Sequence, residues 1–270
     1  MIAAASTVLD TLARYELPPR SIALAWMGQS SVALRVGGAT ILIDPFLSPH
    51  PDRLVPPPFA PDEARGVDLI LITHDHLDHL DELALPAIAS ASPNATVVVP
   101  RGVVERVIEL GVEPARVRGL PADGRTEVGA VMVDAVPACH GVDIADAYRL
   151  GPFLGYVVNA GGARVYHAGD TVPFEGLVER LRALRVHLAF LPINGRDEAR
   201  EAQGIVGNLE AREAAELAGD IAADAVVPMH WDMFAANPGD LAAFVTAAQT
   251  TVIVLQQTRP FVYAAPGETA

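Results

Sequence analysis

Short apolar runs, each bounded by glycine or proline, divide the first part of the chain. They predict closely spaced antiparallel strands. The runs are residues 22–26, 31–36 and 40–43. Gly37 and Gly38 stand between two of them and predict a tight hairpin. The passage over 44–61 is rich in proline, which lacks a backbone donor, so we expect an ordered loop over one edge of the sheet.

Farther along, two runs are almost entirely aliphatic, as is typical of strands covered on both faces. They cover residues 68–73 and 187–191. Apolar residues also recur at helical spacing, over 103–110 and again over 177–184, and each set shares one helix face. Strands and helices thus alternate loosely, without an internal repeat or a linker. The sequence predicts a single α/β domain over residues 1–270.

Two further helices are predicted from their ends. Residues 1–15 have the pattern of a short amphipathic helix, so residues 1–20 are expected to form an N-terminal helical extension. Asn208 is predicted to cap a second helix, with Glu210 in its first turn. An apolar strand over 225–228 should follow that helix.

Composition narrows the class of partner. Half of the chain is hydrophobic, which allows a large core, and 19 basic residues, all arginine, face 33 acidic ones for a net charge of −14. This charge opposes binding to nucleic acid or to anionic membranes and leaves a small-molecule substrate as the expected partner. Cys139 is the single cysteine, and no secretion signal or membrane-length apolar run is present, so we expect a soluble, cytoplasmic protein. A homo-oligomer is compatible with the sequence.

The densest chemistry follows the first aliphatic strand. The segment Thr73-His-Asp-His-Leu-Asp-His79 places three imidazoles and two carboxylates where a strand gives way to a loop. Nitrogen and oxygen donors of this kind are preferred by zinc and similar metals, and a loop can turn them toward one point. A solvated polar loop is the alternative interpretation, which this density disfavours.

His74-x-His76-x-Asp78-His79 resembles the signature of the metallo-β-lactamase superfamily. Three later motifs occur in the order of that family's pattern, and a fourth precedes them. The later ones are His140-Gly141, the segment Tyr166-His-Ala-Gly-Asp-Thr171, and Pro228-Met-His230; the earlier one is Leu42-Ile-Asp44-Pro45. The resemblance implies a four-layer αββα sandwich, the metallo-β-lactamase fold.

The resemblance also implies a ligand set for two divalent ions, zinc or manganese. His74, His76 and His140 would hold one ion, Asp78, His79 and His230 the other, and Asp170 would bridge them. Each ion keeps a place open for water, and a hydroxide bound there near neutral pH would attack the substrate, with Asp78 and Asp170 as catalytic carboxylates. Asp44 is predicted to support a ligand from outside the metal shell. His50, His187 and Cys139 are expected to be structural, and His167 to pack beside the site.

A second polar cluster follows the other aliphatic strand and resembles the branch that contains L-ascorbate-6-phosphate lactonase. Arg196 is predicted to bind a phosphate or carboxylate, Asn194, Asn208 and Asp232 to bind sugar hydroxyls, and Trp231 to supply an apolar wall. These residues have structural interpretations of equal weight: a turn, a helix cap and a surface ion pair.

We therefore predict a metal-dependent hydrolase that opens a lactone of a sugar acid, phosphorylated or not. One alternative is a phosphodiesterase or phospholipase-D-like hydrolase, which shares the same metal loop. Another is a non-catalytic metal-binding sensor, which the complete ligand set disfavours. Nucleic-acid processing is opposed by the charge of −14.

Overall fold

Strand β1 (Ser21–Trp26) is buried along its whole length, and its two faces serve different layers. The computed structural model describes residues 6–267. Ile22, Leu24 and Trp26 pack into a core shared by both β-sheets, whereas Ala23 and Ala25 pack with the helices outside. Alternate residues of a strand point to opposite faces, so a strand between two packed layers is apolar throughout.

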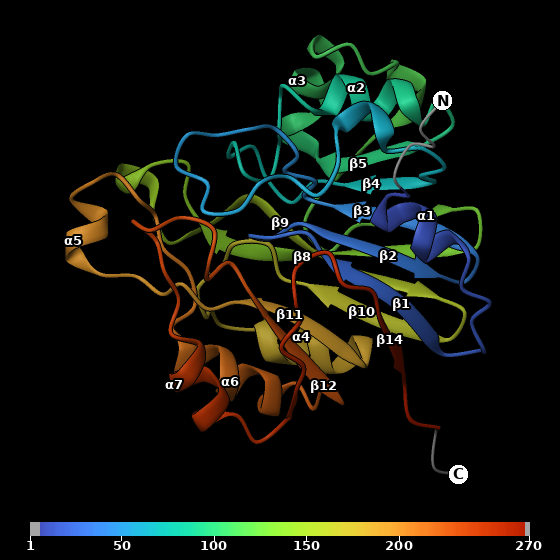
Figure 1. Cartoon of the computed structure of the whole chain (residues 1–270). Coiled ribbons are helices and arrows are strands. Elements are labelled where there is room, and N and C mark those ends of the chain that lie inside the picture. Colours follow the sequence, from blue (N-terminus) through green and yellow to red (C-terminus); the bar gives the residue numbers. More distant parts are fainter. Residues whose placement is uncertain (1–5, 268–270) are drawn as a thin grey trace.

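Two seven-stranded sheets lie face to face, with helices on both outer sides (Figure 1). The first sheet has the order β14-β1-β2-β3-β4-β5-β6. Its other strands are β2 (Val32–Val36), β3 (Ala39–Ile43), β4 (Leu69–Leu71), β5 (Thr96–Pro100), β6 (Val117–Leu120) and β14 (Phe261–Ala264). The predicted hairpin at Gly37 and Gly38 is confirmed, since β2 and β3 pair antiparallel across it.

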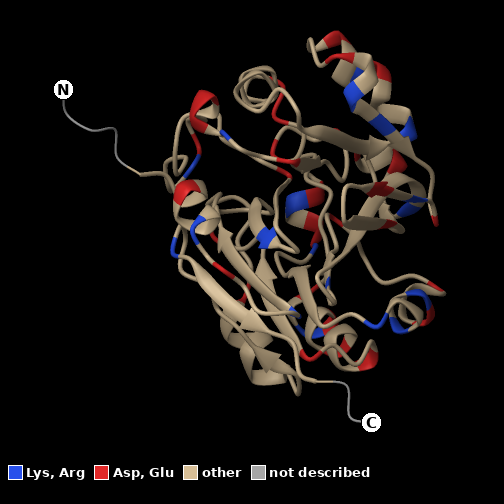
Figure 2. Ribbon diagram, turned by 90° about the vertical axis from the view of Figure 1, so that its right-hand side faces the viewer, with Lys and Arg blue, Asp and Glu red and all other residues tan. Residues whose placement is uncertain are grey.

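The second sheet has the order β13-β12-β11-β10-β9-β8-β7. Its strands are β7 (Arg125–Val128), β8 (Val131–His140), β9 (Arg149–Ala160), β10 (Ala163–His167), β11 (Leu188–Pro192), β12 (Ala225–Met229) and β13 (Thr251–Val252). Charged residues are sparse on the strands of both sheets and concentrate in the outer helices and loops, where acidic and basic positions are mixed (Figure 2).

The helices complete the outer layers. They are α1 (Val8–Ala13), α2 (Leu85–Ala91), α3 (Val104–Glu109), α4 (Leu177–Leu184), α5 (Glu198–Glu201), α6 (Ala211–Asp220) and α7 (Leu241–Ala247), with 3-10 turns η1 (Pro61–Glu63), η2 (Arg101–Val103), η3 (Pro114–Arg116) and η4 (Ile144–Asp146). Helices α1 to α3 pack on the first sheet, and α4, α6 and α7 on the second. This arrangement confirms the predicted αββα sandwich. Within residues 6–267 no helix has the length and apolarity needed to cross a bilayer.

Strand direction places the candidate site. β3, β4 and β5 run parallel, as do β10, β11 and β12, while β8 and β10 each pair antiparallel with β9. The carboxyl ends of parallel strands meet at one edge of a sheet, and loops at that edge commonly hold ligands. The loops after β3, β4, β8, β10, β11 and β12 therefore gather at the same side of the sandwich.

Two local predictions need correction. The N-terminal helix is shorter than predicted, since α1 covers only Val8–Ala13 and begins at a capping box between Thr7 and Asp10; residues 1–5 lie outside the described part. Asn208 does not cap the following helix. The N-cap of α6 is Glu210, whose backbone N–H donates a hydrogen bond to the Glu213 carboxylate. A capping box between two glutamates lacks the Ser, Thr, Asp or Asn usually found at that position, which explains why the sequence pointed to Asn208 instead.

Candidate metal centre

The loop after β4 turns its four candidate ligands inward. The backbone N–H groups of His79 and Leu80 both donate to the carbonyl oxygen of His76, which folds the segment into a tight turn. Asp75 and Leu77, which alternate with the candidate ligands, are exposed, whereas His74 and His79 are buried. Within this short loop, the candidate ligands therefore face the protein interior, while the residues between them face solvent.

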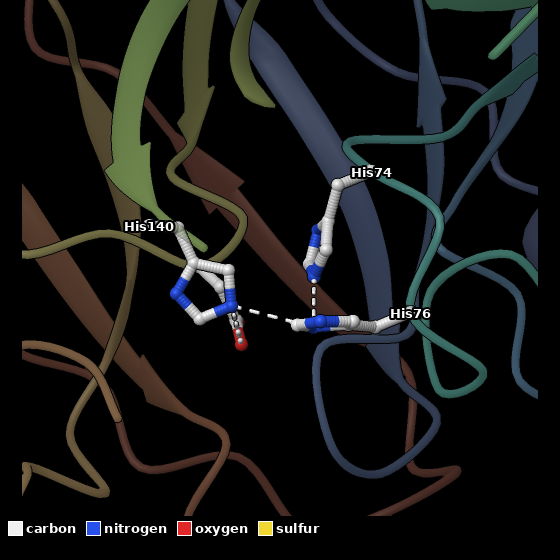
Figure 3. A group of neighbouring side chains, drawn as sticks. His74, His76 and His140 are labelled. Atoms are coloured by element: carbon white, nitrogen blue, oxygen red, sulfur yellow. Dashed lines mark hydrogen bonds and ion pairs between the residues drawn. The ribbon is translucent and has the colours of Figure 1, made fainter. Parts of the chain in front are cut away.

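Three histidines, two from the loop after β4 and one from the end of β8, point toward one another (Figure 3). His74 Nε2 lies 3.0 Å from His76 Nδ1, and His140 Nε2 lies 3.3 Å from the same His76 atom. His140 is the last residue of β8, so the strand itself carries it to the loop after β4. With Asp170, these residues offer four ligand atoms within 4.8 Å of one another.

A second group adjoins the first. Asp78, His79 and His230 offer three ligand atoms within 4.8 Å of one another. Asp170 touches both groups: its Oδ1 lies 3.3 Å from His79 Nε2, and its Oδ2 lies 3.4 Å from His230 Nε2 and 3.7 Å from His140 Nε2. The structure thus brings together all seven predicted ligands, with Asp170 between the two groups.

Asp44 supports the ligand loop from its buried side. Its buried carboxylate accepts hydrogen bonds from the Thr73 backbone at 2.8 Å, the Thr73 hydroxyl at 2.7 Å and His79 Nδ1 at 2.7 Å. The His79 bond leaves Nε2 as the atom that faces the centre. Asp44 follows β3 in a left-handed conformation, with φ +46°. Carboxylates that orient a ligand histidine in this way raise its basicity and fix its ring.

Gln29 belongs to the site although the sequence analysis did not single it out. Its side chain donates to Asp78 Oδ2 at 2.8 Å and lies 3.0 Å from His230 Nε2, and its carbonyl accepts from the His230 backbone N–H at 3.0 Å. Gln29 and His230 both have positive φ, +53° and +58°. Such conformations are strained for residues other than glycine and cluster at functional sites. The one feature of the sequence that could have indicated a role for Gln29 is its position as a polar residue in the turn after β1.

Charges within the cluster favour a cation. At His79, burial opposes protonation, but the surrounding carboxylates, Asp170 foremost, outweigh it and raise the pKa well above the ordinary value. At His230, burial is likewise outweighed by Asp170 and Asp78, which raise the pKa to about 9. Burial and the nearby His79 charge hold the pKa of His74 well below its usual range. The centre therefore attracts positive charge beside its two carboxylates.

The donor set fits divalent metal ions. His79 Nε2 and Asp170 Oδ1 are buried and face each other at 3.3 Å, and neither has any other hydrogen-bond partner within residues 6–267. Buried polar atoms are nearly always satisfied, so these two point to an ion as their partner. Three or four imidazole and carboxylate donors per group match the ligand number and chemistry of zinc sites and also suit manganese.

The residues expected to be structural lie in four separate places, one of them far from the centre. His167 is buried on β10 and its Nε2 lies 2.7 Å from the Ser30 carbonyl, which secures the turn that contains Gln29. His187 accepts from the Arg164 backbone at the other end of the sheet, and Cys139 is a buried thiol. His50 packs edge-on against Phe234, with ring centroids 5.6 Å apart.

The predicted substrate residues form two contact pairs and a stack. Asn208 donates to Asn194 at 3.0 Å. Arg196 is held by both carboxylate oxygens of Glu213, each at 2.7 Å, so binding an anion would require it to leave this partner. The Trp231 ring stacks on Trp26 with centroids 5.7 Å apart.

Asp232 completes the predicted substrate set. Burial raises the pKa of its carboxyl to about 6. Its Oδ1 atom, like Asn208 Oδ1 and Trp231 Nε1, is buried without a hydrogen-bond partner in the described chain. The substrate roles of all five residues stay predictions.

Gly169 allows the loops after β4 and β10 to touch. Its φ is +60°, and a Cβ atom there would lie 2.8 Å from Thr73 Cβ. We expect Gly169→Ala to lower the free energy of unfolding by about 2–4 kcal/mol and to weaken metal retention, because Thr73 supports Asp44 and His74. Gly129→Ala is the matched control, since Gly129 has φ +58° and open space around it, and it should cost only about 1–2 kcal/mol. Equal losses in urea unfolding would contradict the proposed contact.

Comparison with known proteins agrees with this geometry. The model of the beta-lactamase superfamily domain matches residues 39–231. The chain belongs to this family and is a metal-dependent hydrolase of the metallo-β-lactamase superfamily. It is 32% identical over 229 residues to a UPF0173 metal-dependent hydrolase of Methanoregula boonei, covering 84% of this chain and 89% of that protein. A UPF0173 hydrolase of Pyrococcus furiosus is 33% identical over 227 residues, covering 81% and 90%.

Solved structures support the fold. The metallo hydrolase Igni18 of Ignicoccus hospitalis superposes with a TM-score of 0.71 at 22% identity, covering 90% of this chain and 98% of that one. An isothiocyanate hydrolase from Delia radicum gut bacteria gives a TM-score of 0.72 at 19% identity, covering 90% and 100%. None of these proteins is described as an L-ascorbate-6-phosphate lactonase, so the resemblance to that branch stays a prediction.

Proposed function

We propose that this hydrolase opens lactones, with two divalent ions, zinc or manganese, held by the two ligand groups that share Asp170. When bound, such ions lower the pKa of coordinated water and polarise a carbonyl oxygen. We choose a neutral ester over a phosphodiester because the nearby arginines already donate hydrogen bonds to protein oxygen atoms. Phosphodiesters are usually bound by guanidinium groups free to form paired hydrogen bonds.

Three arginines near the site residues each donate to protein oxygen atoms, and of these Arg53 keeps one buried atom, Nη2, without a hydrogen-bond partner within residues 6–267. Arg196 is paired with Glu213. Arg200 donates to Asp197 Oδ2 at 2.6 Å and to the Asn194 carbonyl, and Arg53 donates to the carbonyls of Phe46 and Val55. These contacts favour an uncharged reacting group.

The unpartnered polar atoms suit an oxygen-rich ring. These three atoms are closed to solvent, so the proposal requires the surrounding loops to open. Substrate hydroxyls would then donate to Asn208 Oδ1 and Asp232 Oδ1, and Trp231 Nε1 would donate to a substrate oxygen. An unsatisfied buried polar atom costs about 1–3 kcal/mol, so a substrate that supplied these partners would gain affinity. This is the support for a sugar-acid lactone as the small-molecule substrate.

Asp78 is the predicted ligand closest to the substrate space. It is the only one of the seven that lines the adjacent cavity, and its side chain is 16% exposed. In the proposal, the ring oxygen that leaves receives its proton either from a water molecule or through Asp78, whose pKa stays below its usual range because His79 and His230 outweigh the effect of burial. Asp170 joins the two ligand groups, and Gln29 fixes the orientation of the Asp78 carboxylate.

A substrate panel tests the proposal. Protein loaded separately with zinc and with manganese is assayed on D-glucono-1,5-lactone, its 6-phosphate, unsubstituted and alkyl lactones, and bis(p-nitrophenyl) phosphate. We expect turnover of lactones at least 100-fold above that of the phosphodiester. Turnover of the phosphodiester alone would establish a phosphodiesterase instead, and full metal loading without turnover of any compound would indicate a sensor.

Arg196→Ala separates anion binding from structural support. If Arg196 exchanges Glu213 for a substrate anion, its loss should raise KM for glucono-lactone 6-phosphate by about 10-fold or more and leave KM for the neutral lactone within about 2-fold, because charge-assisted hydrogen bonds contribute about 1.5–3 kcal/mol. Metal content should be unchanged. Glu213→Gln is the control, since it frees Arg196 without removing it. Equal KM changes for both lactones would limit Arg196 to holding the Asn208 carbonyl, 3.0 Å away.

A further inference from the structure

An apolar cavity opens beside Asp78. Its volume is about 570 Å³, and Gln29 and Asp78 form the part of its lining that belongs to the metal centre. The rest comes mainly from apolar side chains, among them Leu54, Leu77 and Phe234. Leu77 lies between two predicted ligands in the loop after β4, so an apolar surface begins next to the reacting atoms.

The cavity walls are held in place by contacts between two loops. Arg53 and Phe234 form an isolated antiparallel bridge, and the Leu54 backbone N–H donates to the Met233 carbonyl at 2.9 Å. Phe234 also contacts the rings of Phe46 and His50, with centroids 6.2 Å and 5.6 Å apart. The proline-rich loop is thus tied to the loop after β12, and the cavity between them is formed in advance.

The charges in the lining disfavour an anionic group. Arg53 is the only arginine among the lining residues, and its guanidinium donates to backbone carbonyls and packs over the Phe46 ring at 4.4 Å. Asp52 and Asp78 contribute carboxylates to the same lining. A phosphate placed here would meet the two carboxylates, and Arg53 Nη2 is the one atom of the lining guanidinium that no hydrogen bond from the described chain occupies. A hydrocarbon chain would meet side chains of its own kind.

Exposed apolar side chains also lie around the opening of the metal centre. Leu54 is 60% exposed and Leu77 56% exposed at the cavity, and Val142, 55% exposed, follows the His140-Gly141 turn. The Val142 carbonyl lies 3.1 Å from His76 Nε2, so this residue adjoins a predicted ligand. Exposed large apolar side chains that gather at a site opening mark a surface for an apolar ligand.

We propose that the substrate has an alkyl substituent on its lactone ring and that this chain occupies the cavity between Leu54, Leu77 and Phe234. The proposal rests on the lactone hydrolysis proposed above. It leaves the polar atoms near Asn208 and Asp232 to the oxygen-bearing ring and adds an alkyl chain on that ring as the substrate class. The cavity selects alkyl lactones over lactones with a phosphate at the same position. Ring opening converts the alkyl lactone and one water into the corresponding hydroxy acid, with the ring C–O bond broken and the proton of water passed to the leaving oxygen.

Two readouts on metal-loaded protein test it. The first is kcat/KM for γ-valerolactone, γ-hexalactone, γ-octalactone and γ-decalactone, which should rise roughly 3-fold per methylene until the cavity is filled. The second is the Kd of butanoate, hexanoate and octanoate by calorimetry, which should fall by about the same factor per methylene. The second readout does not depend on turnover.

Variants locate the effect. Leu77→Ser and Phe234→Ala, made separately, should each flatten both trends to less than about 1.5-fold per methylene. Leu83→Ser is the matched control: Leu83 is 81% exposed and is not among the lining residues, so the trends should keep their slope. Metal content is measured for each variant, because Leu77 adjoins two predicted ligands.

The outcomes separate the two proposals. Rising rates and affinities that both variants flatten would support the alkyl-lactone assignment. Lactone turnover that is independent of chain length, or a higher kcat/KM for glucono-lactone 6-phosphate than for γ-decalactone, would overturn it. Absence of lactone turnover together with the predicted alkanoate trend would reject lactone hydrolysis while supporting the apolar cavity.

Discussion

Asp170→Asn is expected to remove both turnover and stable metal binding. Asp170 is the one residue whose two carboxylate oxygens face both ligand groups, so its replacement affects each group at once. Metal ions contribute several kcal/mol of charge stabilisation in hydrolytic reactions, and 4 kcal/mol corresponds to a rate factor of about 1,000. We expect kcat/KM to fall at least by about that factor, and metal content after dialysis to drop below half of the wild-type value.

Asp75→Asn is the control in the adjacent loop. Asp75 lies between two predicted ligands but is exposed, so its loss of charge should leave metal content unchanged and kcat/KM within about 2-fold. Both variants are measured by elemental analysis and by the lactone assay under identical conditions. Full metal retention in Asp170→Asn would show that this carboxylate does not join the two groups.

Asp44→Asn should weaken metal binding without removing a ligand. The substitution keeps the size of the side chain, and Asn tolerates the left-handed backbone at φ +46° as well as Asp does. It removes the charge that accepts from His79 Nδ1 and presents an amide group to hydrogen-bond donors. We expect metal affinity to fall about 10- to 100-fold and the free energy of unfolding to fall by about 1–3 kcal/mol.

Asp81→Asn separates these two effects. Asp81 is another buried aspartate, and its carboxylate accepts from the backbone of Leu47, Ser48 and Ala84 without touching a predicted ligand. Its replacement should lower stability by a similar amount while leaving metal affinity unchanged. Metal affinity is measured by competition with a chromogenic chelator, and stability by urea unfolding. A loss of metal affinity in Asp81→Asn equal to that in Asp44→Asn would assign the Asp44 effect to general destabilisation.

The predicted ligands could be found from sequence because strand ends determine their positions. His74 and its neighbours follow β4, His140 ends β8 and His230 follows β12, so each lies next to an apolar run that the pattern identifies. β8 pairs only antiparallel, and β4 lies in a different sheet from β8 and β12, so the meeting of these ends depends on how the two sheets pack on each other. The four-layer sandwich and the two-ion ligand set were implied by the resemblance of the motifs to the metallo-β-lactamase superfamily, whereas the apolar runs predicted only individual strands. β1 is apolar on both faces because it lies between two packed layers.

The contacts that orient the ligands could not be predicted in this way. Gln29 reaches Asp78 and His230 across sequence distances of 49 and 201 residues, and no local pattern encodes that meeting. The Arg196 pairing with Glu213 was missed for a related reason, because it depends on where α6 begins. With Asn208 as the predicted N-cap, Glu213 would lie beyond the first turn of the helix. The prediction therefore does not identify Glu213 as the partner of Arg196.

The apolar cavity also depends on tertiary structure. Its main apolar side chains come from three separate loops: Leu54, Leu77 and Phe234. In the sequence, each of them alone is indistinguishable from an ordinary surface apolar residue. The sequence therefore favoured a polar, sugar-like substrate from the residues around Arg196, while the assembled loops add an apolar surface beside Asp78.

A crystal structure of the metal-loaded protein, with anomalous data collected above and below the metal absorption edge, tests the central claim most directly. We predict two anomalous peaks on either side of the Asp170 carboxylate, one surrounded by His74, His76 and His140 and the other by Asp78, His79 and His230. A single peak, or peaks that leave His140 or His230 uncoordinated, would contradict a two-ion centre.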